Sequence, residues 1–139
     1  MNKMNPVVHF EMPAADMGRM KKFYESAFGW QMNQLGAEMG EYVVVTTTET
    51  DENRMVKGSG AINGGFYKKT EDPTSQYPSI VVSVDDIHEA MKKVAESGGK
   101  VVGGHKGDGT PDEIPGVGLY ASIIDTEGNR ISILQPKKM

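Results

Sequence analysis

The chain has 139 residues, which is the size of one domain, and its 37% hydrophobic and 24% charged residues are near globular averages. We therefore expect one folded domain over residues 1–139. The net charge of −4 has the wrong sign for binding nucleic-acid phosphates or an anionic membrane surface. The absence of cysteine excludes disulfides, thiolate metal sites and cysteine nucleophiles.

No apolar run reaches the roughly 18 residues that are needed to cross a membrane. Residues 1–6 show no apolar segment of the kind that marks a secretory signal. We expect a soluble, cytoplasmic protein with neither a nucleic-acid partner nor a membrane partner.

The first half of the chain predicts a strand, a helix and three further strands. Residues 7–12 form a strand-like run that we expect to stop at Pro13. A helix follows, opened by Asp16 and ended by Gly29. Three more strands are predicted at residues 30–34, 41–48 and 60–68. The polar residues 49–58 form the loop between the last two.

The second half repeats this order at an offset of 70 residues. After a strand at residues 79–84, Asp86 opens a helix that ends at Gly98-Gly99, so the spacing from acidic cap to glycine stop is the same in both halves. Three strands follow again, at residues 100–102, 117–124 and 129–135. The sequence thus predicts two similar modules, at about residues 6–69 and 79–136, with a linker at about residues 70–78.

Each predicted helix has an apolar stripe at the spacing that packs on a sheet. The first stripe consists of Met17, Met20, Phe23, Tyr24 and Ala27. The second consists of Ile87, Ala90, Met91, Val94 and Ala95. Trp30, directly after the first helix, is interpreted as an anchor between helix and sheet.

Motifs spread over nearly the whole chain are shared with a known family. They are His9-Phe10-Glu11-Met12-Pro13, Lys22-Phe23-Tyr24-Glu25, Phe28-Gly29-Trp30, Gly60-Ala61-Ile62-Asn63-Gly64-Gly65, Val84-Asp85-Asp86, Gly98-Gly99-Lys100-Val101, Ile114-Pro115-Gly116-Val117-Gly118 and Asp125-Thr126-Glu127-Gly128-Asn129. Through them the chain resembles the vicinal oxygen chelate superfamily of glyoxalase I, bleomycin-resistance proteins and extradiol dioxygenases. It looks most like the glyoxalase-related, predicted lactoylglutathione-lyase-like branch.

The resemblance implies an α+β fold of two βαβββ modules, whose curled mixed sheets surround a shared cavity that is often completed in a homodimer. We accordingly expect a homodimer with a small-molecule ligand. Metal-dependent members of the family hold a divalent ion with up to four ligands from the first and last strands of each module.

His9 stands at the first of these ligand positions, but Ser79 and Ser132 stand where further ligands are expected. The strand around Asn63 offers no carboxylate either. One imidazole with water binds a divalent ion weakly, because useful sites need about three protein ligands. We therefore expect no cofactor. If a divalent metal binds, we expect His9 to be one of its ligands. An arginine that glutathione-using members carry is replaced by Pro13, so glyoxalase I activity is not expected.

Strand alternation places His9 and Glu11 on one face of the first strand, away from the helix and toward the cavity. The pair could exchange a proton, orient each other, or act as general base and acid. The alternative to a functional role is structural. His9 would then be a hydrogen-bonded structural histidine, and Glu11 would form a salt bridge at the rim of the barrel. Five further polar residues are predicted to line the cavity, namely Tyr42, Asn63, Ser79, Tyr120 and Ser132. His88 is expected in solvent, and His105 on a surface loop or pocket lid.

Three functions stay open, and with them the question of whether the chain is an enzyme. The first is metal-free binding or transformation of a small metabolite through His9 and Glu11. The second is a metal-dependent lyase, isomerase or dioxygenase with His9 as one ligand. The third is sequestration of a drug or metabolite without catalysis, as in bleomycin resistance.

Overall fold

The structure is a computed structural model that describes residues 4–52, 56–58 and 60–137. The chain forms two compact units. The first unit is made of residues 9–78, and the second of residues 79–137 together with the N-terminal stretch up to Val8. None of the described helices is long and apolar enough to cross a membrane.

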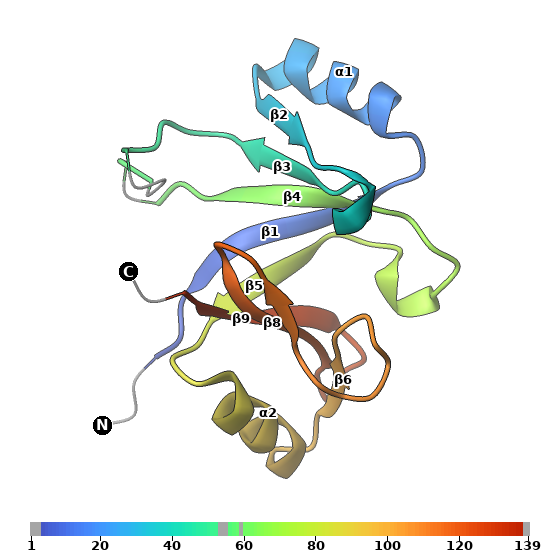
Figure 1. Cartoon of the computed structure of the whole chain (residues 1–139), viewed down its shortest axis with the longest axis vertical. Helices are drawn as coiled ribbons and strands as arrows, with labels where there is room; N and C mark the ends of the chain where they lie inside the picture. The colour runs from blue at the N-terminus through green and yellow to red at the C-terminus, as the bar shows by residue number, and fades with distance from the viewer. Residues whose placement is uncertain (1–3, 53–55, 59, 138–139) are drawn as a thin grey trace. The chain divides into compact units, whose positions relative to one another are not determined.

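The first unit has the strand, helix and three strands that the sequence predicts (Figure 1). Its elements are β1 (Val7–Ala14) from His9 onward, α1 (Met17–Phe28), β2 (Gln31–Gln34), β3 (Val43–Thr46) and β4 (Asn63–Lys68). They form a sheet in the order β2-β3-β4-β1, in which β1 and β4 are parallel and the other pairs antiparallel. Two short 3-10 helices lie at Ala37–Met39 and Pro73–Ser75.

The second unit repeats the plan with β5 (Ser79–Ser83), α2 (Ile87–Glu96), β6 (Lys100–Gly103), β8 (Gly118–Ile124) and β9 (Arg130–Pro136). Its sheet order is β6-β8-β9-β5, again with one parallel pair, β5 with β9. An extra strand, β7 (Asp112–Ile114), pairs with β8 where the sequence analysis predicted no strand. The predicted α+β class with two repeated modules is confirmed.

The predicted helix boundaries follow from their caps. The Asp16 carboxylate accepts a hydrogen bond from the backbone N–H of Arg19 at 3.0 Å, and Gly29 ends α1 in the left-handed region at φ 71°. Asp86 caps α2 in the same way. The predicted end of the first strand at Pro13 is wrong, because β1 continues to Ala14. A proline has no N–H to donate, but its carbonyl and side chain fit a strand end.

Each helix covers one face of its own sheet, and the two cores differ in kind. The first core contains Ala14, Met20, Val43, Val45 and Phe66, with Phe10, Tyr24 and Trp30 packed against it. The second is aliphatic, built on Val84, Ile87, Ala121, Ile123 and Ile133. Of the ten aromatic residues in the chain, all except Tyr120 lie between residues 10 and 77.

Trp30 joins α1 to the first sheet. Its ring stacks on Tyr24 of α1 with centroids 4.8 Å apart and planes 8° apart, and it contacts Phe10 of β1 at 5.6 Å. The interpretation of Trp30 as an anchor is confirmed. Since the helices occupy one face of each sheet, the polar residues of alternate strand positions are left on the other face.

Candidate functional site

His9 and Glu11 lie on the face of the first sheet that points away from α1. Their neighbours in β1, Phe10 and Met12, pack into the core beneath the helix. Because strand side chains alternate, positions 9 and 11 face the opposite way. Both side chains therefore lie on the face opposite α1, and their place in a ligand cavity stays a prediction.

The His9 ring is held by the backbone of the neighbouring strand. Its Nδ1 lies 3.2 Å from the carbonyl oxygen of Asn63, the residue opposite His9 in the β1–β4 register. A carbonyl oxygen only accepts, so this hydrogen bond requires the proton on Nδ1. In the neutral ring Nε2 then carries a lone pair, the state that a general base or a metal ligand needs.

Glu11 is buried, with 7% of its surface exposed, and its Oε2 accepts a hydrogen bond from the Tyr42 hydroxyl at 3.0 Å. Gly65 of β4 lies between Glu11 and β3 in the sheet. A Cβ at this glycine would lie 1.9 Å from the Tyr42 hydroxyl oxygen. The tyrosine therefore reaches Glu11 across a position that has no side chain.

Asn63 has a structural role that the sequence analysis did not foresee. Its Oδ1 accepts hydrogen bonds from the backbone N–H groups of Thr47 at 2.7 Å and Thr48 at 3.3 Å. The Thr47 hydroxyl donates to the carbonyl of Ile62 at 2.6 Å. Asn63 thus fixes the base of the β3–β4 connection with its side chain and orients His9 with its carbonyl.

The second unit carries a smaller polar set on the corresponding face of its sheet. The hydroxyl groups of Tyr120 and Ser132 lie 2.6 Å apart, and Arg130 donates to the hydroxyl of Ser122 at 3.2 Å. Ser79, at the start of β5, is half-buried. Arg130 and Ser122 were not predicted, although each is two residues from Ser132 or Tyr120 on the same strand face, and that period was the signal available.

The residues do not fit the divalent ion that the fold family implies. In the described ranges, no group of three or more His, Asp and Glu side chains is placed to hold a metal ion. His9 Nδ1 contacts a backbone carbonyl and Glu11 Oε2 accepts from a phenol hydroxyl. The pair brings one imidazole and one carboxylate, fewer than the about three protein ligands of a useful divalent-metal site.

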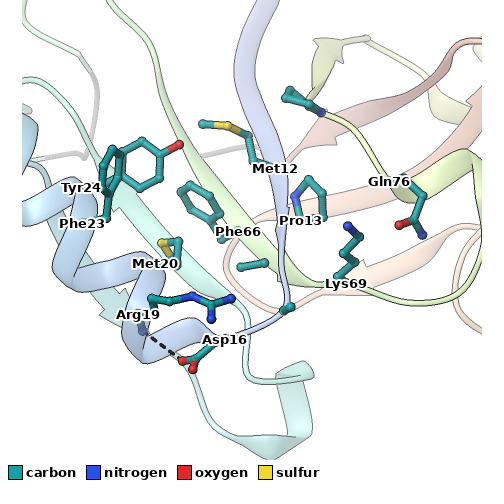
Figure 2. Close-up of a pocket in the computed structure, with 13 residues that line it drawn as sticks. Met12, Pro13, Asp16, Arg19, Met20, Phe23, Tyr24, Phe66, Lys69 and Gln76 are labelled. Atoms are coloured by element: carbon teal, nitrogen blue, oxygen red, sulfur yellow. Dashed lines mark hydrogen bonds between the residues drawn. The ribbon is translucent and has the colours of Figure 1, made fainter.

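An open pocket of about 550 Å³ lies on the α1 side of the first sheet, at the first turn of the helix (Figure 2). Met12 and Phe66, which belong to the core beneath α1, contribute to its lining. Because His9 projects from the other face of the sheet, this pocket is separate from the His9 and Glu11 pair. No sequence pattern predicted a site at this place.

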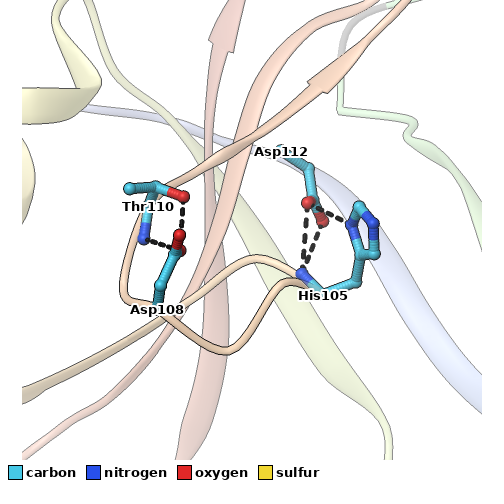
Figure 3. Close-up of polar contacts among 4 residues, drawn as sticks. All are labelled: His105, Asp108, Thr110 and Asp112. Carbon is cyan, nitrogen blue, oxygen red and sulfur yellow. Dashed lines mark hydrogen bonds and ion pairs between the residues drawn. The ribbon is translucent and has the colours of Figure 1, made fainter.

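The β6–β7 loop is closed by two carboxylate contacts (Figure 3). The Asp112 carboxylate accepts from the backbone N–H and the ring Nδ1 of His105, and the Asp108 carboxylate accepts from the N–H and hydroxyl of Thr110. The hydrogen bonds from Thr110 lower the pKa of Asp108 below its usual value. His105 is exposed, so its predicted place on a surface loop is confirmed, as is the exposure of His88.

Residues 7–48 match the family model described as bleomycin resistance protein-like N-terminal. The chain is 27% identical over 123 residues to a glyoxylase-like domain-containing protein of Didymella fabae, which covers 88% of each chain. It is 25% identical over 114 residues, 82% of this chain, to a Mycobacterium tuberculosis protein named as a glyoxylase. The chain spans only 38% of that mycobacterial relative's length.

Solved structures share the fold over nearly the full length. A glyoxalase/bleomycin resistance protein/dioxygenase superfamily member from Vibrio splendidus superposes with a TM-score of 0.56 at 14% identity, over 95% of this chain and 99% of that one. Methylmalonyl-CoA epimerase from Mycobacterium tuberculosis superposes with a TM-score of 0.64 at 14% identity, over 95% and 88%.

The repeated modules, with a polar sheet face opposite each helix, give the chain the α+β fold of these solved structures. Together with the family model and the relatives, this fold supports the resemblance to the vicinal oxygen chelate superfamily that the motifs indicated.

Proposed function

We propose that this protein binds a small carbonyl-containing metabolite against the polar face of the first sheet and transfers a proton through His9 without a bound metal. The observation that carries the proposal is the hydrogen bond between His9 Nδ1 and the Asn63 carbonyl. It leaves Nε2 as the acceptor and keeps the ring in one orientation, as a general base requires.

Glu11 supports this role through its place on the same strand face. Positions two apart in a strand are about 6.5 Å apart along the chain, a separation that a small metabolite can bridge. The step would move a proton from the carbon beside the carbonyl to His9 Nε2, leaving the electron pair on the carbonyl oxygen as an enolate. Return of the proton completes an isomerisation or exchange, and no oxidant or reductant is consumed.

Hydrogen exchange at carbon gives a direct test. The protein would be incubated in D₂O with EDTA and a panel that includes a 2-oxo acid, an α-hydroxyketone and methylmalonyl-CoA, the last because epimerases of that thioester share the fold. We expect at least one compound to incorporate deuterium at the carbon beside its carbonyl. Proton NMR measures this as the loss of the corresponding proton signal. His9→Gln should lower the rate at least about 100-fold, because general base catalysis contributes about 10²–10⁴.

His88→Gln is the matched control, because His88 is exposed on α2. It should leave the exchange rate unchanged. Exchange that appears only after addition of Ni, Zn, Mn or Fe would replace this proposal by the metal-dependent lyase, isomerase or dioxygenase. Tight binding without exchange in any compound would favour a sequestering protein of the bleomycin-resistance type. An undiminished rate in His9→Gln would refute the role of His9.

Nitrogen NMR of the His9 ring tests the geometry without a substrate. We expect the neutral ring to carry its proton on Nδ1, because Asn63 offers only an acceptor. A ring protonated on Nε2 would remove the observation on which the proposal rests. The homodimer expected from the family resemblance stays a prediction, which sedimentation of the protein would test.

A further inference from the structure

The pocket beside α1 has an apolar floor that reaches the surface. The floor includes Met20 and Phe66, which are buried in the first core. Phe23 and Tyr24 extend it along the helix, with ring centroids 5.0 Å apart in an edge-to-face arrangement. Phe23 was predicted to be buried by its place in the helical stripe, but 57% of its surface is exposed.

Two cationic side chains stand at this pocket. Arg19 comes from the first turn of α1, and Lys69 follows the end of β4, where its backbone N–H donates to the carbonyl of Ala14 at 2.9 Å. Figure 2 shows both side chains among the lining residues. In the described part of the chain, no side-chain hydrogen bond or ion pair engages either cation. Asp16 supplies the single carboxylate of the lining, and it caps the helix.

The far wall of the pocket is held by hydrogen bonds within the first unit. Gln76 donates through Nε2 to the carbonyls of Thr70 at 2.6 Å and Asp72 at 2.8 Å. The Tyr67 hydroxyl donates to the carbonyl of Ser75, a buried residue of the short 3-10 helix, at 3.0 Å. The segment that was predicted as a linker therefore forms this wall and is held by side-chain hydrogen bonds.

We propose that this pocket binds a small amphipathic carboxylate, with its acyl or aryl part on the Met20, Phe23 and Phe66 floor and its anionic group between Arg19 and Lys69. An apolar floor with a few placed polar groups is the usual composition of a ligand pocket, and about 550 Å³ lies within the usual range of volumes. Two cations against one carboxylate favour an anion over a neutral ligand. The site is independent of His9, which lies across the sheet.

Methyl NMR can follow this pocket directly, because Met12 and Met20 line it and Met91 lies on α2. The protein would be titrated with octanoate, 1-octanol and acetate at concentrations below micelle formation. We expect saturable shifts of the Met12 and Met20 methyl signals with octanoate, at least fivefold weaker binding of octanol and acetate, and no change at Met91. Equal binding of octanol and octanoate would overturn the proposed selection for an anion.

The double variant Arg19→Gln/Lys69→Gln should weaken octanoate binding at least fivefold and abolish its dependence on salt. Lys92→Gln/Lys93→Gln removes two charges from the exposed face of α2 and should leave binding unchanged. His9→Gln should also bind octanoate normally, so a failure of the proposed proton transfer would not affect this result. Unchanged affinity in the Arg19/Lys69 variant, with normal methyl spectra, would overturn the site.

Discussion

The two units have the same arrangement of strands, but their side chains form different hydrogen bonds on the sheet face that points away from the helix. In the first sheet, Val44 of β3 is opposite Gly65 of β4, which is opposite Glu11 of β1. Tyr42, two residues before Val44, passes over Gly65 and donates to Glu11. A hydrogen bond thus connects β3 to β1 across the strand between them.

In the second sheet the equivalent residues are Ser122, Ser132 and Val81. Tyr120, two residues before Ser122, corresponds to Tyr42, but its hydroxyl lies 2.6 Å from Ser132 on the adjacent strand. In the second unit the Tyr120 hydroxyl therefore contacts the side chain of Ser132 on the adjacent strand. In the first unit the equivalent position is Gly65, which has no side chain, so the Tyr42 hydroxyl reaches the next strand. The absence of a Cβ at Gly65 is thus what allows the Tyr42 phenol to reach the buried carboxylate of Glu11.

The largest expected effect lies on the core side of these strands, where Phe66 and Ile133 occupy equivalent positions. Phe66→Ala should lower the free energy of unfolding by about 3–5 kcal/mol and Ile133→Ala by about 2–5 kcal/mol, because both leave cavities. Urea denaturation followed by far-UV circular dichroism measures both. Ile80→Ala, at an exposed position, should change it by less than about 0.5 kcal/mol. A Phe66 variant as stable as the Ile80 control would contradict the assigned core.

Gly65→Ser makes the first unit like the second. The new side chain collides with Tyr42 and separates it from Glu11, so we expect a loss of about 1–3 kcal/mol in the free energy of unfolding. Gly58→Ser is the control, because a Cβ there meets no atom within 4 Å. If both variants were equally stable, the passage of Tyr42 over Gly65 would not matter to the fold.

Removal of the two phenol hydroxyls should have unequal effects. Tyr42→Phe removes a donor from a buried carboxylate and should cost about 1.5–3 kcal/mol, whereas Tyr120→Phe removes a bond between neutral groups and should cost about 0.5–1.5 kcal/mol. Thermal and urea denaturation of the two variants side by side provide the measurement. The reverse order would show that the second unit, and not the first, depends on its tyrosine.

The smallest effect concerns the β8–β9 turn. Hydrogen bonds from the side chain and N–H of Asn129 and from the N–H of Glu127 lower the pKa of Asp125 below its usual value. A lowered pKa means that the ionised group stabilises the fold above the usual aspartate value and loses this contribution as the pH falls through the folded-state pKa. Below about pH 4, amide protection of the turn should therefore fall.

Hydrogen exchange measured against pH tests this, with Asp125→Asn as the variant that removes the acid-sensitive step. Glu96→Gln, at an exposed position at the end of α2, should keep the wild-type profile. An acid profile that Asp125→Asn leaves unaltered would assign the sensitivity to another group.

The sequence predicted what depends on local chemistry. The caps at Asp16 and Asp86 and the alternation of β1 were sufficient to place both helices and the direction of His9. What the sequence could not provide depends on strand register, such as the crossing of Tyr42 over Gly65 and the use of Asn63 to hold Thr47 and Thr48. A shift of one residue in register reverses every such contact.

The pocket beside α1 was missed for a related reason. The stripe of the helix predicted that Phe23 is buried, but a stripe defines only a direction from the helix axis. Whether the side chain is covered depends on how far the sheet extends beneath it. That distance is set by β1 together with β4 and the segment around Gln76, and the last two are remote from the helix in sequence.

The aromatic residues give the two units very different spectroscopic signals. With the single tryptophan and all tyrosines and phenylalanines except Tyr120 in the span from residue 10 to residue 77, ultraviolet absorption, fluorescence and near-ultraviolet dichroism report almost entirely on the first unit. An unfolding curve recorded with these signals therefore contains almost no contribution from the aliphatic second unit. A difference between that curve and the amide signal would reveal the two halves melting separately, with no label added to the protein.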